Sequence, residues 1–525
     1  MGIYLNPGNS GFAAVRKSEY IDKSGLIALI NSTIGTSFKL TCISRPRRFG
    51  KSYAAKMLCA YYDAACDSAS LFEDLEIAVN QEYAEHYQEH LNRYHVVYLD
   101  MTALLAACKA EELTSFITES VGQELIAVLP ELQQNPALYA MMATFAEKTG
   151  RQFVMIIDEW DAPIREHPEI EQNYLHFLRS LFKNSGVTDK IFAAAYMTGI
   201  LPIKKDGSQS AISDFKEYTM VKPRKFAPYV GFSEEEVRGL CEKHDVSFTE
   251  MKRWYDGYGF KNVSSVYNPN SVMEAVRNDA FESYWTETSA SSSLLDYISM
   301  DQEGLAKTIV ELLGGVRVHV NPLGFANDLR TFRNRDDVLT LLIHLGYLAY
   351  DDEDETVRIP NEEIRLEFSR VIREVRNTET MRRVRESDQL IMDTVNGNAQ
   401  AVAAQIEKIH LEETSPLFYN NEQALRSVIK LAYFSYKDDF IKFEELPSGR
   451  GYADLVYFPK KRSGMPALLI ELKWDKDAAG AIEQIKQKKY PSALSEYGGE
   501  VLLVGISYEK DDNSGKHHCV IERME

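Results

Sequence analysis

Short apolar runs alternate with amphipathic segments over the first half of the chain. The amphipathic segments have apolar residues at helical spacing, and the clearest of them cover 111–129, 138–149 and 171–184. Strands and helices in alternation predict a parallel sheet that is covered by helices on both faces. The expected strands, rich in β-branched or aromatic residues, are 38–44, 95–101, 153–158, 191–198 and a weaker 218–221.

The pattern changes near residue 233, after which helical spacing dominates. Ser233 followed by Glu236 has the form of a capping box, which predicts the start of a helix. The aromatic segment 254–260 interrupts the helices and is expected to be a packing turn rather than a platform for stacking bases. The acidic run 351–355 is expected at the tip of a hairpin. These features predict a helical middle region over 233–400.

The last part of the chain has the pattern of a small α/β domain. Its expected helices are 421–436 and 478–489, and its expected strands are 441–445, 453–458, 467–472 and 501–507. The whole chain is therefore expected to be an α/β protein with three parts, at 1–232, 233–400 and 401–525.

Composition limits the classes of protein to which this chain can belong. The 525 residues carry a formal net charge of −19, which disfavours nonspecific nucleic-acid coating by the whole surface but permits a local basic channel. The six cysteines are scattered without a C-x-x-C pair, as expected in a reducing compartment without structural zinc. No apolar run approaches about 18 residues, and the N-terminus lacks a signal-peptide pattern. We therefore expect a cytoplasmic protein without a membrane partner.

The segment Ile43–Ser52 has the setting of a phosphate-binding loop, because it follows an apolar run and precedes a helical one. It ends in Gly50-Lys51-Ser52, where the glycine would let backbone N–H groups approach a phosphate. We expect Lys51 to contact the β- and γ-phosphates of ATP and Ser52 to bind Mg²⁺. Arg45 stands where the usual P-loop pattern has its first glycine.

Three arginines, Arg45, Arg47 and Arg48, lie within this loop. We interpret them as positive charge beside the phosphates, which would compensate for the missing glycine. Exposed loop arginines are the alternative, but this alternative explains neither their clustering nor the replaced glycine.

The apolar run Phe153–Asp158 leads into two acids, Asp158 and Glu159. Asp158 is expected to bind Mg²⁺ and Glu159 to polarise the water that attacks the γ-phosphate. An ordinary buried strand that leads into a polar loop is the alternative. The P-loop strand comes first, the acidic strand third, and a fourth strand ends near Thr198, as in additional-strand P-loop ATPases. Thr198 is either a sensor of the γ-phosphate or a turn residue at a strand end.

A second group of charged residues lies near the C-terminus. Because side chains alternate along a strand, Glu471 and Lys473 share a face, and Asp454 on a neighbouring strand can join them. Two carboxylates, with the carbonyl of Leu472 as a further ligand, suit Mg²⁺. Lys473 could stabilise the charge that develops on a phosphate. The group predicts phosphodiester hydrolysis, and a surface hairpin with an acid–base pair is the alternative.

Other polar residues surround this group in sequence. Gln484, Lys488 and Tyr490 follow on a predicted helix and suit contacts with a nucleic-acid backbone. Glu422 and Glu445 are weaker carboxylate candidates, for which capping or solvated roles are equally expected. The histidines show no H-E-x-x-H spacing, and the sequence contains no serine nucleophile elbow.

Taken together, these motifs resemble those of bacterial and archaeal fusion proteins that join an AAA-ATPase-like domain to a C-terminal PD-(D/E)XK nuclease domain. An arginine at the first P-loop position is normal in that family. The nuclease turn of the family usually reads Gly-Arg-Ala-Asp, and Tyr452 takes the place of its arginine here, which leaves the metal-binding acids intact. The matching segments, in consistent order over nearly the whole chain, are 44–52, 157–163, 198–203, 254–258, 267–269, 451–456, 470–474 and 481–490.

The resemblance implies an additional-strand, AAA-like P-loop domain and a restriction-endonuclease-like α/β domain. The leading hypothesis is an ATP-binding and ATP-hydrolysing domain that regulates a Mg²⁺-dependent nuclease, with Mn²⁺ as a second usable metal and DNA favoured over RNA. A role in defence or mobile-element biology follows only by analogy. The alternative is an ATP-dependent signalling or scaffold protein whose C-terminal domain binds nucleic acid or a partner without cleaving it. A P-loop without turnover is a third hypothesis, and homo-oligomers are left open.

Overall fold

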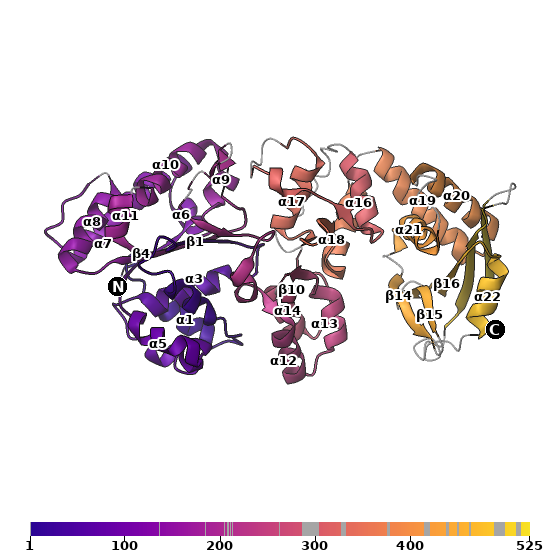
Figure 1. Ribbon diagram of the computed structural model, residues 1–525, viewed down its shortest axis with the longest axis horizontal. Helices are drawn as coiled ribbons and strands as arrows, with labels where there is room; N and C mark the ends of the chain where they lie inside the picture. Colours follow the sequence, from indigo (N-terminus) through magenta and orange to yellow (C-terminus); the bar gives the residue numbers. More distant parts are fainter. Residues whose placement is uncertain are drawn as a thin grey trace. The chain divides into compact units, whose positions relative to one another are not determined.

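The chain forms two compact units, each built from two separate stretches of sequence (Figure 1). Unit 1 comprises residues 1–284 and 319–362, and unit 2 comprises residues 285–318 and 363–525. The predicted division at residues 232 and 400 stays a prediction. The computed structural model describes residues 2–135, 137–183, 185–203, 205–206, 209–210, 212, 214–261, 263–285, 304–326, 332–374, 378–413, 421–436, 440–448, 451–460, 464–487, 499–510 and 516–524.

Unit 1 contains a five-stranded sheet in which every neighbouring pair of strands runs parallel. The strand order confirms the predicted additional-strand arrangement, because β4 lies between the P-loop strand β1 and the acidic strand β3. Four of the predicted strands form with ends within two residues of the prediction, and the weaker fifth, predicted at 218–221, shares only Tyr218 with the observed strand. In spatial order they are β2 (His95–Asp100), β3 (Phe153–Asp158), β4 (Phe192–Gly199), β1 (Leu40–Ser44) and β7 (Lys216–Tyr218).

Helices cover both faces of this sheet. The strands β1, β3 and β4 are buried along their whole length, as their nearly continuous apolar sequences require. One face packs on α7, α8 and α10 in a single apolar core, where each fully buried Leu, Ile or Phe contributes about 1.5–3 kcal/mol. The P-loop helix α3 packs against β2, β3 and β4. The helices of this part are α1 (Ser10–Arg16), α2 (Gly25–Asn31), α3 (Lys51–Tyr62), α4 (Glu76–Val79), α5 (Gln81–His90), α6 (Met101–Ala107), α7 (Leu113–Val128), α8 (Leu138–Thr149), α9 (Ala162–Glu166), α10 (Glu171–Phe182) and α11 (Ser185–Ile191).

The remainder of unit 1 mixes helices with short strands. The capping box at Ser233 and Glu236 is confirmed at the start of α12. The aromatic turn packs as predicted, because Tyr255 and Tyr258 are buried and the Tyr258 hydroxyl donates to the carbonyl of Gly346. The elements are the hairpin β5 (Lys205–Asp206) and β6 (Gln209–Ser210), β8 (Phe232–Ser233), α12 (Glu234–His244), α13 (Phe248–Tyr255), β9 (Tyr258–Phe260), β10 (Val263–Tyr267), α14 (Pro269–Asn278), α17 (Arg335–Leu345), β12 (Ala349–Asp351) and β13 (Thr356–Arg358).

The predicted helical middle region is therefore less uniform than its sequence pattern. It holds two three-stranded sheets, with orders β8-β10-β9 and β11-β13-β12, where β11 is Val318–His319. The acidic run 351–355 does connect the two strands of the predicted hairpin, β12 and β13. Except for the five-residue β10, these strands have only two or three residues, which leaves little alternation to recognise in the sequence.

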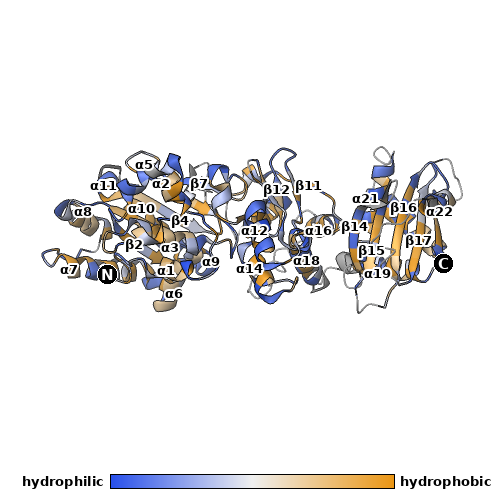
Figure 2. Ribbon diagram, turned by 90° about the horizontal axis from the view of Figure 1, so that it is seen from below, coloured by the Kyte–Doolittle hydropathy of each residue, from blue (hydrophilic) through white to orange (hydrophobic). Residues whose placement is uncertain are grey.

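Unit 2 is a five-stranded mixed sheet covered by helices on both faces. The spatial order is β14-β15-β16-β17-β18, in which only β16 and β17 pair in parallel. Figure 2 shows β15, β16 and β17 coloured hydrophobic along most of their length. The strands are β14 (Phe440–Ser448), β15 (Gly451–Pro459), β16 (Ala467–Trp474), β17 (Val501–Tyr508) and β18 (His517–Arg523), and the helices are α16 (Leu305–Leu313), α18 (Glu362–Glu374), α19 (Thr378–Val395), α20 (Ala399–Glu413), α21 (Glu422–Ala432) and α22 (Ala478–Gln487).

The two faces of this second sheet have separate apolar cores. One core joins alternate strand residues to α19, α20 and α21, and the other joins them to α22. The edge strand β18 was missed by the sequence prediction, because its His-His-Cys-Val-Ile-Glu-Arg sequence lacks a clear alternation of apolar and polar residues.

Candidate functional sites

The P-loop of unit 1 has the geometry that its sequence predicted. Gly50 is the N-cap of α3 and has a φ of +86°, a left-handed conformation that glycine adopts without steric cost. Lys51 and Ser52 are therefore the first two residues of the helix, where free N–H groups and the helix dipole favour an anion. The Lys51 side chain is 3% exposed, and its Nζ lies 2.9 Å from the carbonyl oxygen of Pro46.

The acidic end of β3 lies beside this helix. The strand register pairs Asp158 with Asp100 on one side and with Thr198 on the other. Burial raises the pKa of Asp158 to about 6; a hydrogen bond from Ser52 opposes this shift, and the neighbouring charge of Glu159 adds to it. The contact between Ser52 and Asp158 brings together the two side chains that were predicted to share Mg²⁺.

Glu159 is held in an unusual conformation next to the P-loop lysine. Its backbone φ of +51° lies in the left-handed region, which is uncommon for a residue with a long side chain. Its carboxylate lies 3.4 Å from Lys51 Nζ and 3.3 Å from Nη2 of Arg165. Arg165, on α9, was not singled out from the sequence, although it follows the Asp-Glu pair closely in the chain.

Asp161, another residue that the sequence prediction missed, connects the acidic loop to the end of β4. Its buried carboxylate accepts hydrogen bonds from the backbone N–H groups of Ile200 and Leu201 and from Nε of Arg165. A side chain at Gly199 would clash with it, because a Cβ there would lie 2.4 Å from Asp161 Oδ1. Asp161 therefore fixes the backbone that follows Thr198, which is itself fully buried.

The structure corrects the interpretation of one loop arginine. Arg45 is fully buried, donates to the carbonyl oxygens of Ser44 and Tyr218, and lies over the ring of Phe260. Burial lowers the pKa of its guanidinium to about 10. Arg45 thus lies inside the fold and stabilises the loop through hydrogen bonds to backbone carbonyls. The expectation that it places charge beside the phosphates is wrong.

The other two loop arginines are half-buried. Arg48 has a φ of +67° and donates to the carbonyl oxygen of Tyr284 at 2.8 Å. Arg48 lines the cavity beside the P-loop, whereas Arg47 is not among its lining residues. The predicted phosphate contact of Arg47 stays a prediction.

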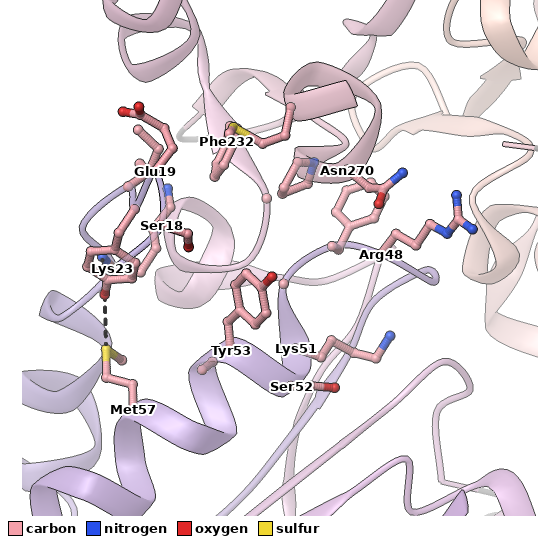
Figure 3. Close-up of a pocket in the computed structure, with 18 of the residues that line it drawn as sticks. Ser18, Glu19, Lys23, Arg48, Lys51, Ser52, Tyr53, Met57, Phe232 and Asn270 are labelled. Carbon is pink, nitrogen blue, oxygen red and sulfur yellow. Dashed lines mark hydrogen bonds between the residues drawn. The ribbon is translucent and has the colours of Figure 1, made fainter. Parts of the chain in front are cut away.

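A cavity of about 300 Å³ opens beside the start of α3 (Figure 3). Tyr53 stands on this helix with 55% of its surface exposed, and Phe232 and Asn270 lie across the cavity from it. The cavity therefore combines the P-loop with residues from the end of the sheet domain and from α14. Its lining includes Ser18, Glu19, Tyr20, Lys23, Arg48, Gly50, Lys51, Ser52, Tyr53, Glu159, Phe232, Asn270 and Arg277.

In unit 2 the structure brings together the three predicted C-terminal residues. The antiparallel pairing of Leu455 with Ile470 places Asp454 and Glu471 one residue further along neighbouring strands. Asp454 is 8% exposed and Glu471 is 2% exposed, and Asp454 Oδ2 accepts a hydrogen bond from the Leu472 N–H at 2.9 Å. Lys473 Nζ lies 3.5 Å from Glu471 Oε1. Two buried carboxylates and a lysine thus occupy one place on the sheet, unlike the exposed pair of an ordinary hairpin.

Two further side chains contact these acids. Gln484, on α22, donates its amide N–H to Glu471 Oε1, so it lies at the acid pair as well as on the helix predicted to face nucleic acid. Arg426, on α21, forms an ion pair with Asp454 and was not predicted. Lys488 and Tyr490 lie outside the described residues, as do the side chains of Tyr452 and Glu445. Glu422 begins α21 as an exposed first-turn acid.

Comparison with family models gives two matches along the chain. Residues 8–208 match a model described as a predicted AAA-ATPase, AAA-ATPase_like. Residues 420–517 match a model of the PD-(D/E)XK nuclease superfamily, PDDEXK_9. The first match contains the P-loop, the acidic strand and Thr198, and the second contains Asp454, Glu471 and Lys473.

Individual relatives are more distant. An uncharacterised protein in the vnfD 5′ region of Azotobacter chroococcum mcd 1 is 24% identical over 304 residues, or 56% of this chain, and the chain spans 55% of that relative's length. A Walker-type ATPase of Pyrococcus abyssi is 13% identical with a TM-score of 0.34, over 66% of this chain and 96% of that one. The ORC2 protein of Aeropyrum pernix, solved as ADPNP–ADP complexes, is 13% identical with a TM-score of 0.31, over 68% of this chain and 96% of that one.

These structural similarities are too low to support an argument, so the fold assignment rests on the strand order in each unit. Among the described helices, none is long and apolar enough to cross a membrane. The family models and the strand orders agree with the motifs in the sequence. The chain carries a predicted AAA-ATPase domain at residues 8–208 and a PD-(D/E)XK nuclease superfamily domain at residues 420–517.

Proposed function

We propose that this protein binds and hydrolyses ATP in unit 1 and uses that cycle to regulate phosphodiester cleavage, on DNA, in unit 2. The observation that carries the proposal is that both predicted residue groups assemble within one chain. Lys51, Ser52 and Asp158 converge at the start of α3, and Asp454, Glu471 and Lys473 converge on one sheet.

The residues at both sites fit a hard divalent cation. Ser52 and Asp158 offer a hydroxyl and a carboxylate that already contact each other, and Asp454 and Glu471 offer two buried carboxylates. Oxygen donors of this kind suit Mg²⁺ and Mn²⁺. When bound, such an ion supplies positive charge to phosphate oxygens and makes a bound water more acidic.

The residues of unit 1 suit phosphate binding and the orientation of a water. The N-terminus of α3 provides N–H groups for phosphate oxygens, and the Lys51 ammonium provides a positive charge. Glu159 lies 3.4 Å from Lys51, and we assign to its carboxylate the role of accepting a proton from the water that attacks the γ-phosphate. Tyr53 and Phe232 give the adjoining cavity the apolar surface that a nucleotide base needs.

The residues of unit 2 suit the charge changes of phosphodiester hydrolysis. Asp454 is fixed by the Leu472 N–H, which orients its carboxylate toward the neighbouring strand. Lys473 places an ammonium group next to Glu471, where it can stabilise the extra negative charge on the phosphate in the transition state. Gln484 fixes the carboxylate of Glu471 from the helix α22.

The test is cleavage of plasmid and linear DNA by the full-length protein with Mg²⁺ or Mn²⁺, with and without ATP. We expect Glu471→Ala combined with Lys473→Ala to abolish cleavage while ATP hydrolysis persists. Lys486→Ala combined with Glu522→Ala is the matched control, because it removes an exposed ion pair in the same unit. Cleavage by the first double variant at the wild-type rate would rule out the nuclease assignment.

The regulatory part of the proposal has its own readout. ATP or a nonhydrolysable analogue should change the cleavage rate of the wild type, and Lys51→Ala should remove that change. Equal cleavage rates with and without nucleotide would show that ATP does not regulate cleavage. DNA binding without any cleavage, in the presence of either metal, would instead favour the role of a scaffold that is controlled by ATP.

A further inference from the structure

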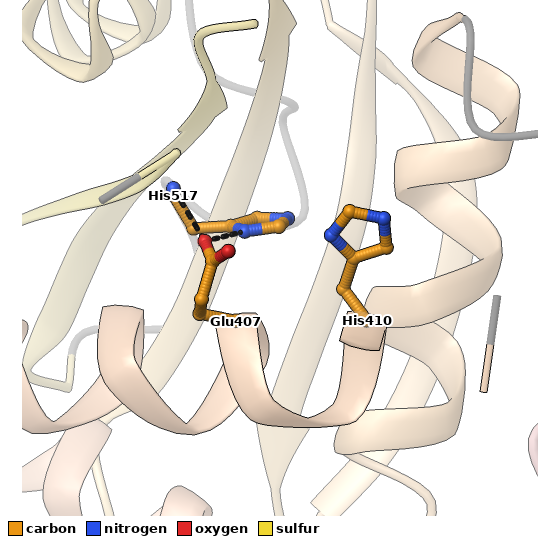
Figure 4. A group of neighbouring side chains, drawn as sticks. All are labelled: Glu407, His410 and His517. Atoms are coloured by element: carbon orange, nitrogen blue, oxygen red, sulfur yellow. Dashed lines mark hydrogen bonds and ion pairs between the residues drawn. The ribbon is translucent and has the colours of Figure 1, made fainter. Parts of the chain in front are cut away.

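Three side chains of types that bind metal ions lie together in unit 2, apart from the predicted nuclease acids Asp454 and Glu471 (Figure 4). Glu407 and His410 are one helical turn apart on α20, and His517 is the first residue of β18. One ligand atom from each of the three residues lies within 4.8 Å of the others. The cluster joins positions that are more than a hundred residues apart, so no local spacing reveals it.

The cluster is held inside the fold. The His517 side chain has no exposed surface, His410 is 6% exposed, and the Glu407 side chain is 26% exposed. The two imidazole rings are 5.1 Å apart, and both rings contact Tyr508. Val402 and Ile406, on the same helix, lie in the apolar core, which fixes the orientation of α20 on the sheet. Little freedom remains for the two rings to turn away from each other.

Glu407 is the charged member of this cluster. Its Oε2 accepts hydrogen bonds from the backbone N–H of His517 at 3.0 Å and from Nδ1 of the same residue at 2.6 Å. Burial lowers the pKa of both His410 and His517.

We infer that Glu407, His410 and His517 form a binding site for a divalent transition-metal ion, with Zn²⁺ as the best match. Two imidazoles and one carboxylate are donors that Zn²⁺ prefers over Mg²⁺, and three protein ligands leave a fourth position for water. Bond lengths of about 2.0–2.1 Å put donor atoms about 3.3 Å apart. Binding therefore opens the Glu407–His517 hydrogen bond slightly and draws His410 inward.

The site has a defined position relative to the predicted nuclease residues. Leu472 and Trp474 alternate with Glu471 and Lys473 along β16, and Trp474 stacks on Tyr508. The cluster consequently lies behind the sheet face that carries Glu471. An ion there would attach the edge strand β18 to α20, a structural task distinct from phosphodiester cleavage.

The test measures metal content of the full-length protein by mass spectrometry after dialysis with Zn²⁺ and removal of free ion. We expect one Zn²⁺ per chain in the wild type and at least about a hundredfold weaker binding in His410→Ala and in His517→Ala. Glu412→Gln, on the same helix, and Asp454→Ala, in the predicted nuclease site, serve as controls that keep the ion. Zinc content that is unchanged in both histidine variants would contradict the proposed site.

Co²⁺ absorption and thermal unfolding provide two further readouts. The wild type should develop the visible absorption of a tetrahedral Co²⁺ site, and Zn²⁺ should displace it. Zn²⁺ should also raise the unfolding temperature of the wild type but not that of His410→Gln. A wild type that gives no such spectrum and no shift contains only a hydrogen-bonded Glu–His pair, and the proposal fails.

Discussion

The two candidate sites contain similar side chains in different surroundings. In unit 1, the acids Asp158 and Glu159 stand at the end of a parallel strand, beside the first turn of a helix. In unit 2, Asp454 and Glu471 lie within antiparallel strands, and the nearest helix presents a glutamine from its interior. The first arrangement offers backbone N–H groups to a phosphate, whereas the second is built from side chains: two carboxylates, a lysine, a glutamine and an arginine.

Under the proposed function, this difference predicts which ligand each site binds first. A helix N-terminus attracts the phosphates of a nucleotide directly, so the acids of unit 1 need only hold the accompanying cation. Two buried carboxylates repel a phosphate, so we expect unit 2 to bind a cation before nucleic acid. In both units an arginine of the chain partly offsets the acids, Arg165 at Glu159 and Arg426 at Asp454.

The largest effect is expected from Glu159→Gln. If Glu159 accepts the proton of the attacking water, the variant should lose about 10²–10⁴-fold in ATP hydrolysis while nucleotide affinity stays near that of the wild type. Phosphate release and nucleotide binding by fluorescence check the two quantities. Glu166→Gln, a nearby and more exposed position, is the control. Equal loss in both variants would place the general base elsewhere.

The next effect concerns Arg426→Ala, which leaves the buried Asp454 carboxylate without its arginine. We expect a loss of about 3 kcal/mol in the metal-free stability of unit 2, measured by denaturant unfolding. Mn²⁺ should restore stability more strongly in this variant than in the wild type, because the ion and Arg426 compete for one carboxylate. Arg382→Ala, at a more exposed ion pair, should cost under about 1 kcal/mol.

A pH effect follows from Asp158. Its pKa rises from the ordinary 3.8 to about 6, so the unfolded chain ionises this group more readily than the folded one. The group costs nothing while both states are protonated, well below pH 3.8. Metal-free stability should then fall by up to about 3 kcal/mol as the pH rises from about 4 to about 6, and it should stay constant above that range. Urea unfolding of wild type and Asp158→Asn over this range checks the sign, and parallel pH profiles would contradict it.

The smallest effect is expected from Arg45→Met, which replaces a buried guanidinium by an apolar chain of similar length. Because Arg45 does not line the cavity, ATP affinity should stay within about twofold and stability within about 1 kcal/mol. Lys51→Met, measured in the same titration calorimetry, should weaken ATP by about a hundredfold. A similar loss of ATP affinity in both variants would show that Arg45 contributes to phosphate binding after all.

The sequence was sufficient to predict the elements and residues that depend on the local spacing of apolar and polar positions. Buried parallel strands are apolar throughout, so Phe153–Asp158 was recognisable together with the acids at its end. Alternation within a strand was enough to place Glu471 beside Lys473. The roles in ATP binding and in DNA cleavage assigned to these residues remain predictions.

Contacts between elements that are far apart in sequence could not be predicted from such patterns. Arg165 and Arg426 look like ordinary helix arginines, and only the packing of α9 and α21 directs them to the acids. Arg45 was misinterpreted because its position in the loop says nothing of the direction in which its side chain points. His517 and Glu407 meet only because β18 pairs with β17 under α20, and the weak pattern of β18 concealed that strand.

The interleaved course of the chain has a consequence for synthesis. Residues 285–318 leave the ribosome before unit 1 is complete, because 319–362 still has to be made, yet they belong to unit 2. Their helix Leu305–Leu313 has an apolar face that must wait for α19 and α21. We therefore expect the apolar face of this helix to stay uncovered in the nascent chain until α19 and α21 have been made. A fragment that begins at Glu363 would lack this helix and should be prone to aggregation.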